Sequence, residues 1–352
     1  MEVFDSIVIG GGQAGLASGY HLKRKGLKFI ILESQAQAAG SWPRYYESLK
    51  LFSPARVSSL PGMKFPSAPN RYPLRNEVIQ YFKQYKAHFN LPVKTNQHID
   101  RVTREGQLFA IHTNEGNKFL AKTLINATGS FHSPYKPQIP GQDTFRGEML
   151  HSSDYRRPEA FAGKRVLVVG RGNSAVKIAV ELAEKSHTSL AVLKPVQFTK
   201  QRVLGIDLHL WVRAIGFDTF PFWRFGKNAP NPSSVVDLDQ YQLKLKARKP
   251  DQRQMFTAFY EDGVIWPDGK KEAVDAVIFA TGYRPTLNHL NELGATDSKG
   301  APIQRAGVSE TVPGLYYVGL YGQRSFASAT IRGVGPDANF VVKKLKKYLS
   351  KR

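Results

Sequence analysis

Short apolar runs recur along the chain, and two of them lead directly into a turn built from glycines. The first run, residues 7–9, is Ile-Val-Ile and is typical of a buried parallel strand. A Gly-x-Gly-x-x-Gly turn at residues 10–15 follows, and residues 16–25 are compatible with a helix. A second apolar run covers residues 28–32. The pattern predicts a strand, a glycine turn, a helix and a second strand in that order.

The glycines of this first turn have separate physical roles. Gly10 allows the tight turn, Gly12 lets a pyrophosphate approach the backbone, and Gly15 lets the helix pack on the strand. The phosphates then lie at the N-terminus of the helix. Glu33 follows the second strand, where a carboxylate reaches a ribose hydroxyl. Strand, glycine turn, helix, second strand and carboxylate in this order predict a dinucleotide site. A glycine-rich turn without such a function would explain the order poorly.

The same pattern returns in the second half of the chain. Residues 166–169 form an apolar run that enters the Gly-Arg-Gly-Asn-Ser turn of residues 170–174. Ala175 takes the third glycine position, which is an accepted variant of the motif. Another apolar run, residues 190–193, ends at Lys194. An Ala-Thr-Gly sequence also follows a strand in each half of the chain, so we predict two dinucleotide-binding units.

The two units differ in the residue that follows their second strand. Glu33 suits a free ribose 2′-hydroxyl, whereas Lys194 suits a 2′-phosphate. We therefore assign FAD to the first unit and NADPH to the second. NADH stays the alternative if Lys194 is only a surface lysine. Arg171 adds positive charge inside the second glycine turn, for the same phosphate or for the pyrophosphate.

The rest of the pattern completes an α/β fold. Helical periodicity marks residues 75–89, and short strands between residues 93 and 120 suggest a small meander. A strand at residues 314–319 precedes a C-terminal helix that we expect to start at about Pro336. The fold class predicted is two Rossmann-like domains of the three-layer β/β/α type.

We expect the NAD(P)H-binding domain to be inserted into the FAD-binding domain. Residues 1–150 and 300–352 form the predicted FAD-binding domain, and residues 151–299 the NAD(P)H-binding domain. An insertion at about 197–255 interleaves aromatic residues with arginine and lysine. We interpret it as a substrate lid or hydrophobic entrance, with aromatic packing against the domain and transient membrane contact as alternatives. Single-stranded nucleic acid also fits such interleaving, but no nucleic-acid motif accompanies it.

Composition narrows the function classes. The 352 residues include no cysteine, which excludes the redox-active cysteine pair of flavin-dependent disulfide reductases. A net charge of +22 favours anionic ligands such as NADPH, nucleic acid or an acidic membrane, although a solvated basic surface is the commoner explanation of such a charge. No run of about 18 apolar residues occurs, and the first strand starts too early for a signal peptide. We expect a soluble cytoplasmic protein without a metal.

Between the two units stands a motif that gives the sequence a family resemblance. The sequence Phe145-x-Gly147-x-x-x-His151-x-x-x-Tyr155 precedes the second glycine turn, and Phe-Ala-Thr-Gly-Tyr occupies residues 279–283. With these motifs the chain resembles the flavin-containing monooxygenases, and is most like their small bacterial members. Tyr155, where Baeyer-Villiger monooxygenases usually have tryptophan, favours oxidation of heteroatoms over oxidation of ketones.

The resemblance implies a reaction cycle and a set of residues. NADPH reduces FAD, reduced flavin binds oxygen as a C4a-hydroperoxide, and that species oxygenates a soft nucleophile such as a sulfide or an amine. His151 and its motif link the domains and help to place the nicotinamide; a purely structural histidine is the alternative. By motif match the FAD set is Gly10, Gly12, Gln13, Gly15, Glu33 and Trp42, and the NADPH set is Gly170, Gly172, Asn173, Ser174 and Lys194. Neighbouring cofactor-binding candidates are Ala14, Ser34, Ser41, Leu49, Ala127, Thr128, Gly129, Arg171, Ala280, Thr281 and Gly282.

Two departures from the family pattern affect these expectations. Phe52 occupies the position where larger members place an asparagine beside the flavin C4a. Loss of that amide would slow oxygenation or release hydrogen peroxide, so an NAD(P)H oxidase or reductase is one alternative function and Baeyer-Villiger oxidation another. Gly319 is followed by Leu320 where many related flavoproteins have aspartate for the ribityl chain. The expected partners are a small-molecule substrate, O2 and a second copy of the chain in a homodimer, with no specific nucleic acid.

Overall fold

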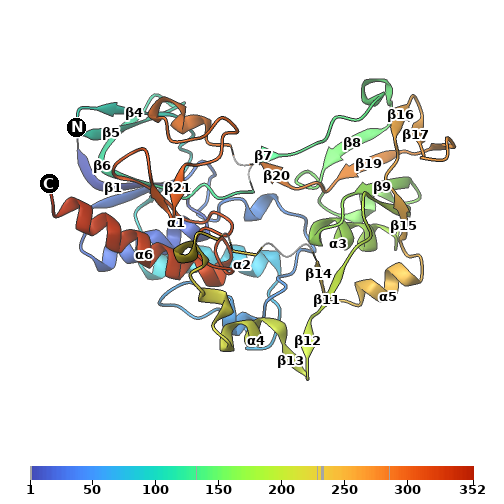
Figure 1. The fold of residues 1–352 in the computed structure, drawn as a ribbon, viewed down its shortest axis with the longest axis horizontal. Helices are drawn as coiled ribbons and strands as arrows, with labels where there is room; N and C mark the ends of the chain where they lie inside the picture. Colours follow the sequence, from blue (N-terminus) through green and yellow to red (C-terminus); the bar gives the residue numbers. More distant parts are fainter. Residues whose placement is uncertain (1, 132, 228, 231–233, 285) are drawn as a thin grey trace.

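Two main sheets, one mixed and one parallel, and an insertion organise the molecule, as Figure 1 shows. The computed structural model describes residues 2–131, 133–227, 229–230, 234–284 and 286–352. The first sheet and its helices form the left half of Figure 1, and the second sheet forms the right half. The insertion, with α4 and β13, lies at the lower edge of that view. The predicted fold class is confirmed.

The first sheet has nine strands around a parallel centre. Its order is β21-β22-β23-β6-β1-β2-β3, and the antiparallel pair β4-β5 joins it at β6. Residues 118–126 form one continuous strand, so the predicted meander runs directly into the central sheet. The strands are β1 (Val3–Ile9), β2 (Phe29–Leu32), β3 (Val93–Lys94), β4 (Ile99–Glu105), β5 (Leu108–Thr113), β6 (Lys118–Asn126), β21 (Gln304–Arg305), β22 (Val308–Ser309) and β23 (Leu315–Tyr317).

Helices α1 (Gln13–Arg24), α2 (Arg75–His88) and α6 (Ile331–Leu349) pack with this sheet around one core. The C-terminal helix starts earlier than predicted, because Pro336 lies inside α6. The first turn forms before the proline, since the Gly333 and Val334 N–H groups both donate to the Thr330 oxygen at 3.0 Å. Pro336 is the sixth residue of α6, beyond the first turn, so it removes one backbone hydrogen bond from the helix interior.

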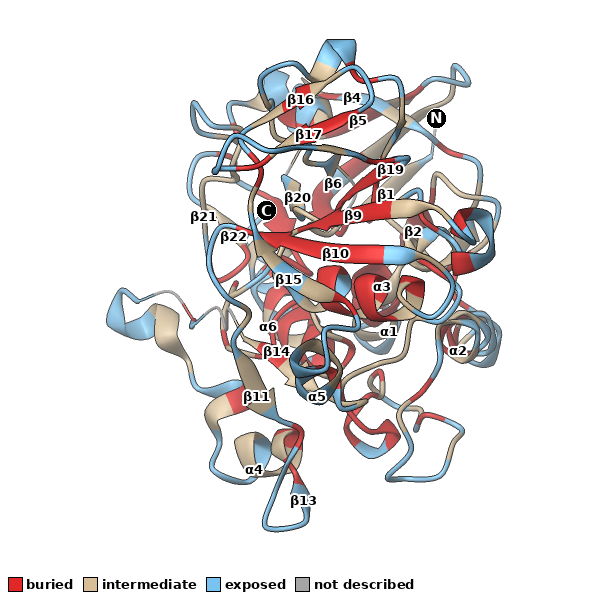
Figure 2. Ribbon diagram, turned by 90° about the vertical axis from the view of Figure 1, so that its right-hand side faces the viewer, coloured by how far each residue is buried: buried red, intermediate tan, exposed pale blue. Residues whose placement is uncertain are grey.

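The second sheet is smaller and deeply buried, as the colours of Figure 2 show along β9 and β10. Its order is β15-β10-β9-β19-β8, with all pairs parallel. The strands are β8 (Glu148–His151), β9 (Arg165–Val169), β10 (His187–Val192), β15 (Asp251–Gln254) and β19 (Ala276–Phe279), and α3 (Asn173–Leu182) follows β9. A separate meander contains β16 (Ala258–Tyr260), β17 (Gly263–Ile265) and β18 (Lys271–Ala273).

The two halves are joined by an antiparallel pair, β7 (Ser133–Pro134) and β20 (Tyr283–Arg284). Soon after this pair the chain returns to the first half, because Leu287, Leu290 and Ala295 are buried in the same core as strands of the first sheet. Short 3-10 helices occupy several connections: Trp42–Arg44, Ala55–Val57, Gln142–Thr144, Pro158–Phe161 and Asn288–Leu293.

The insertion is built from short elements and reaches back to the first half. Its aromatic side chains pack there, since the Phe217 ring lies 5.2 Å from that of Phe326 and the Trp223 ring 5.6 Å from that of Phe340. Its elements are β11 (Phe198–Lys200), β12 (Arg202–Val203), β13 (Ile206–Asp207), α4 (Leu208–Ala214), the 3-10 helices Phe217–Thr219 and Phe222–Phe225, β14 (Val235–Asp237) and α5 (Tyr241–Lys246). Among the described residues, no helix has the length and apolarity needed to cross a membrane.

Candidate functional site

The glycine turn of each half lies against the Ala-Thr-Gly segment of the same half. A Cβ atom added at Gly10, whose φ is +105°, would lie 2.6 Å from the Ala127 carbonyl oxygen. At Gly170, with φ +137°, it would lie 2.4 Å from the Ala280 carbonyl oxygen. Only glycine fits such a close approach at a positive φ. The repeated sequence motifs therefore correspond to one repeated packing arrangement at the carboxyl ends of parallel strands.

Glu33 is fixed beside the first glycine turn. Its side chain is buried, with the residue 3% exposed. Oε2 accepts a hydrogen bond from the Gly11 backbone N–H at 2.7 Å, and Oε1 accepts one from the Gln35 N–H at 2.8 Å. These bonds orient the carboxylate where the sequence predicted a ribose contact.

A cavity of about 800 Å³ extends between the two halves and is lined by residues of both glycine turns. Its volume lies within the roughly 300–1,000 Å³ typical of ligand pockets. Of the predicted residues, those that line it are Gly10, Gly12, Gln13, Ala14, Glu33, Ser34, Ser41, Trp42, Leu49, Phe52, Ala127, Thr128, Gly129, Gly172, Asn173, Ser174, Ala280 and Gly282. The cavity therefore brings most of the candidates from both units together.

Trp42 is connected to the glycine-turn helix through Gln13. The Trp42 Nε1–H donates to Gln13 Oε1 at 3.1 Å, and Gln13 Nε2 donates to the Ala329 carbonyl. Ala329 lies two residues before the start of α6 and also lines the cavity. Three segments far apart in the sequence thus meet at this end of the cavity.

The other predicted residues lie behind the cavity wall or outside it. Gly15, Gly170, Arg171, Lys194 and Thr281 do not line the cavity. Gly15 is a packing position, since a Cβ there would meet the Gly10 carbonyl oxygen at 1.8 Å. Lys194 is exposed and follows the end of β10 at Val192 by one intervening residue.

His151 is fully buried and does not line the cavity. The Ser153 N–H donates to Nδ1 at 3.1 Å, so Nδ1 is unprotonated and Nε2–H donates to the Gly282 carbonyl at 2.9 Å. The imidazole ring also meets the Tyr283 ring edge to face, with centroids 5.0 Å apart. Burial lowers the pKa of His151, which agrees with a neutral ring. Its contacts are to Gly282 and Tyr283, which do line the cavity.

Several cavity residues carry no recognised sequence motif. Lys177 of α3 is one: its Nζ donates to the Lys50 carbonyl oxygen at 2.8 Å, and burial lowers its pKa to about 8. It stands one helical turn after Asn173, so helical periodicity from the glycine turn was the available signal. Others without such a signal are Arg44, Tyr45, Lys50, Gln97, His98, His289, Tyr321 and Arg332.

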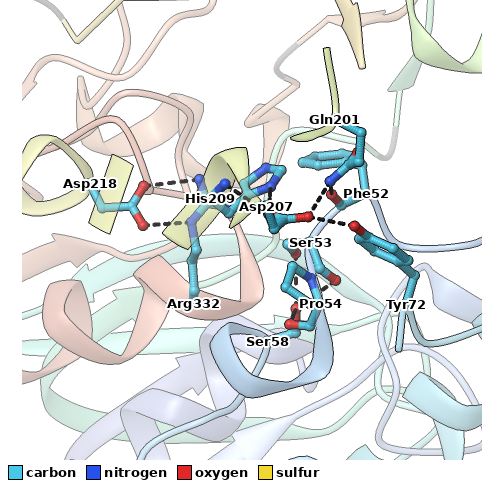
Figure 3. Close-up of polar contacts among 10 residues, drawn as sticks. All are labelled: Phe52, Ser53, Pro54, Ser58, Tyr72, Gln201, Asp207, His209, Asp218 and Arg332. Carbon is cyan, nitrogen blue, oxygen red and sulfur yellow. Dashed lines mark hydrogen bonds and ion pairs between the residues drawn. The ribbon is translucent and has the colours of Figure 1, made fainter. Parts of the chain in front are cut away.

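Phe52 forms part of the cavity wall. Figure 3 shows it beside Gln201 and His209 of the insertion. The Phe52 and His209 rings stack with centroids 5.6 Å apart. Gln201 Nε2 donates to the Phe52 carbonyl oxygen at 3.1 Å. Both partners belong to the aromatic and basic insertion, so the insertion contributes to this side of the cavity.

A second contact between the insertion and the cavity wall is a buried ion pair. Arg332, which lines the cavity at the start of α6, donates through Nε and Nη2 to the two oxygens of Asp218 at 2.9 and 3.0 Å. The two side chains are 7% and 6% exposed. Asp218 also accepts at its backbone oxygen from the Ala327 N–H at 3.2 Å.

Two glycine turns of the dinucleotide-binding type on one cavity are the arrangement of an oxidoreductase that works with two nucleotide cofactors. No group of three or more metal-ligating side chains occurs among the described residues. The comparisons with known proteins place this class more exactly.

Residues 7–215 match the family described as pyridine nucleotide-disulphide oxidoreductase. The uncharacterized oxidoreductase CzcO of Bacillus subtilis is 35% identical, over 97% of this chain and 99% of that protein. The flavin-containing monooxygenase of Stenotrophomonas maltophilia superposes with a TM-score of 0.86 at 33% identity, over 99% of this chain and all of that one. The indole-3-pyruvate monooxygenase YUCCA4 of rice, Oryza sativa subsp. japonica, is 28% identical, over 97% of this chain and 87% of that protein.

The chain belongs to the pyridine nucleotide-disulphide oxidoreductase family and, within it, to the flavin monooxygenases. It is an NAD(P)H-dependent oxidoreductase of the kind that uses FAD and NADPH. The predicted family, enzyme class and cofactors are thereby confirmed. The family description mentions disulfide reduction, and this chain has no cysteine to form a redox-active cysteine pair.

Proposed function

We propose that this enzyme oxygenates soft nucleophiles, namely sulfides or amines. The observation that carries the proposal is the wall formed by Leu49, Leu51 and Phe52, an apolar surface on the cavity that both glycine turns share. An apolar surface favours an uncharged, polarisable reacting group over a strongly hydrated one. The resemblance of Tyr155 and its motif to the heteroatom-oxidising branch supports the same choice.

We assign the two cofactors to the two turns. FAD would be held by Gly10, Gly12, Gly15 and Glu33, with Gln13, Ala14, Ser34, Ser41, Trp42, Leu49 and residues 127–129 along its length. NADPH would be held by residues 170–174 and Lys194, with residues 280–282 beside the turn. The residues present fit these groups, because Gly129 and Gly172 face open space in which an added Cβ would meet nothing within 4 Å.

When bound, FAD and NADPH supply the redox chemistry and the activation of oxygen. For a sulfide, the net reaction consumes one sulfide, one O2, one NADPH and one proton, and it yields one sulfoxide, one water and one NADP⁺. The protein's own residues position the groups that line the site and exclude water from it. Phe52 and its neighbours keep water from the reacting centre, and His151 positions Gly282 and Tyr283 through its bond to the Gly282 carbonyl.

The experiment that tests this is rapid mixing of NADPH-reduced, FAD-loaded enzyme with oxygenated buffer, with and without methyl phenyl sulfide or a tertiary amine. We expect a transient flavin spectrum that decays faster when substrate is added, together with stoichiometric sulfoxide or N-oxide. Direct return to oxidised flavin with every sulfide and amine left unchanged would contradict the proposal. A cyclic ketone serves as a third arm, and a lactone product would reassign the enzyme to Baeyer-Villiger oxidation.

The presence of Phe52 favours a second candidate function, that of an NAD(P)H oxidase that releases hydrogen peroxide. A phenyl ring cannot donate a hydrogen bond, so this position of the cavity wall offers no amide to stabilise bound oxygen. Stoichiometric peroxide from NADPH and O2 in the same rapid-mixing experiment would support it.

We also propose a revised division of the chain. The second sheet starts with β8 at Glu148, and Leu287 already packs in the first core, so the NAD(P)H-binding domain would span about 148–284. The homodimer and the cytoplasmic location stay predictions.

A further inference from the structure

His209 supports the aromatic ring of Phe52 from outside the cavity. Phe52 lines the cavity and His209 does not. Their rings are stacked at an interplanar angle of 29° with centroids 5.6 Å apart, within the range of favourable offset stacking. The imidazole therefore covers the Phe52 ring on the side of the insertion (Figure 3).

Asp207 fixes the orientation of the His209 ring. One carboxylate oxygen, Oδ1, accepts from the His209 backbone N–H at 2.8 Å and from Nδ1–H at 3.0 Å. Both residues are buried, at 6% and 5% exposure. Asp207 is also the N-cap of α4, so the ring is held relative to the whole helix. Two bonds to one oxygen leave the imidazole little rotational freedom.

The other carboxylate oxygen connects the same unit to the backbone of Phe52. Oδ2 accepts from the Tyr72 hydroxyl at 2.5 Å and from Gln201 Nε2, which also donates to the Phe52 carbonyl. Burial opposes ionisation of Asp207, but the hydrogen bonds from His209, Tyr72 and Gln201 outweigh it and lower its pKa. The carboxylate thus stays charged, and the ring and the backbone of Phe52 are both tied to it.

We propose that His209, held by Asp207, is a positioning residue that keeps Phe52 in place on the cavity wall. The insertion thereby determines how completely water is excluded from the reacting centre. The inference rests on the proposed function, because poor exclusion diverts NADPH, a proton and O2 to NADP⁺ and hydrogen peroxide at the expense of substrate oxygenation.

Three variants separate the ring from its hydrogen bond. His209→Leu removes the ring, His209→Phe keeps a ring but loses the bond to Asp207, and His187→Leu changes an exposed histidine of β10 as a control. The FAD-loaded enzymes are compared for the fraction of consumed NADPH that appears as peroxide with methyl phenyl sulfide present. We expect His209→Leu to raise this fraction roughly two- to tenfold, in line with the contribution of an aromatic pair. His209→Phe should raise it less than His209→Leu does, because the ring and the backbone N–H bond to Asp207 remain and only the Nδ1–H bond is lost. His187→Leu should stay near the wild type.

The route through Phe52 is tested by a double substitution. In a Phe52→Leu background, adding His209→Leu should raise the peroxide fraction no further, because the ring that His209 supports is already gone. FAD content and melting temperature show that each variant is folded. An unchanged peroxide fraction in His209→Leu would overturn the inference, and so would an equal increase with and without Phe52.

One readout does not depend on oxygenation. With no substrate present, the rate at which oxygen reoxidises the reduced flavin should rise in His209→Leu, rise less in His209→Phe and stay at the wild-type value in His187→Leu. If the wild type forms no sulfoxide, the proposed function fails, yet this comparison still decides the role of His209. Equal reoxidation rates in all variants would refute that role.

Discussion

Breaking the Asp218–Arg332 ion pair should release the insertion from the cavity wall. Both side chains are more than nine-tenths buried, and the pair makes two hydrogen bonds. Removing one partner of a buried pair leaves an uncompensated charge and typically costs about 3–5 kcal/mol. Asp218→Asn and Arg332→Met should each lower the free energy of local opening of the insertion by about this amount. The double variant should cost less than their sum, because neither charge is then left alone.

The exposed pair Arg146–Glu261 provides the matched control. Its side chains are 77% and 51% exposed, so Glu261→Gln should cost no more than about 1 kcal/mol. Hydrogen exchange followed by mass spectrometry on the peptide that spans α4 and residues 217–219 is the assay. In Asp218→Asn, amides of this peptide should exchange roughly 100- to 4,000-fold faster, since each 1.4 kcal/mol is a factor of ten. Strands β1 and β9 should keep their protection.

The reasoning would be refuted if Asp218→Asn changed exchange in the insertion no more than Glu261→Gln does. It would also fail if protection fell equally in β1 and β9, because the pair would then stabilise the whole fold and not the position of the insertion. Measured coupling of the Asp218 and Arg332 substitutions gives the strength of the pair itself.

Five further substitutions test the cofactor assignment, the packing of the second glycine turn and the pH dependence of stability. Lys194→Glu should raise the KM for NADPH roughly fivefold, which is equivalent to ~1 kcal/mol for an exposed charge contact. It should leave the KM for NADH nearly unchanged. Equal effects on both KM values would contradict a contact with the 2′-phosphate. Burial lowers the pKa of Lys177 to about 8, so its positive charge is lost between pH 7 and 9. If Lys177 binds NADPH, the KM for NADPH should increase over this pH range. Lys177→Met should abolish the increase. Gly172→Ala should fold normally, because its Cβ meets no protein atom within 4 Å, and should bind NADPH weakly, because that open space is where we place the cofactor. Gly170→Ala should destabilise the protein, because its Cβ would lie 2.4 Å from a carbonyl oxygen. Burial lowers the pKa of His21 from 6.5 to about 4, so the folded state loses stability as the pH falls below about 6.5. Urea unfolding at pH 7 and pH 5 should show a smaller loss of stability in His21→Gln than in the wild type. An equal loss in both proteins would argue against His21 as the cause.

The double architecture could be predicted from the sequence because its signals are local. A buried parallel strand, a glycine turn and a helix lie within about 20 residues of one another, and each has a distinctive composition. The same holds for the Ala-Thr-Gly segments, whose close approach to Gly10 and Gly170 leaves no room for a side chain. The start of α6 was missed because Pro336 resembles a helix start in sequence, while the bonds that begin the helix come from Thr330.

The cavity wall on the insertion side was not predictable in the same way. Phe52 meets His209 and Gln201, and Arg332 meets Asp218, across separations of more than 100 residues. No periodicity or motif marks such pairs, since each residue alone looks like an ordinary loop or surface residue. The aromatic content of the insertion indicated packing or a lid, but only the structure assigns Asp207 and Asp218 as its buried contacts.

The two nucleotide units differ in burial in a way that matches different roles. Glu33 is buried, hydrogen-bonded to backbone N–H groups and part of the cavity lining. Lys194 is exposed and lies outside the cavity, and Gly172 is open to solvent. A cofactor enclosed by the first set would exchange slowly, because its release has to break contacts that water cannot readily replace. A cofactor at the second set would dissociate after each turnover. On the cofactor assignment that we propose, this asymmetry suits a resident flavin at the first set and a diffusing NADPH at the second, and it arises from the same fold used twice.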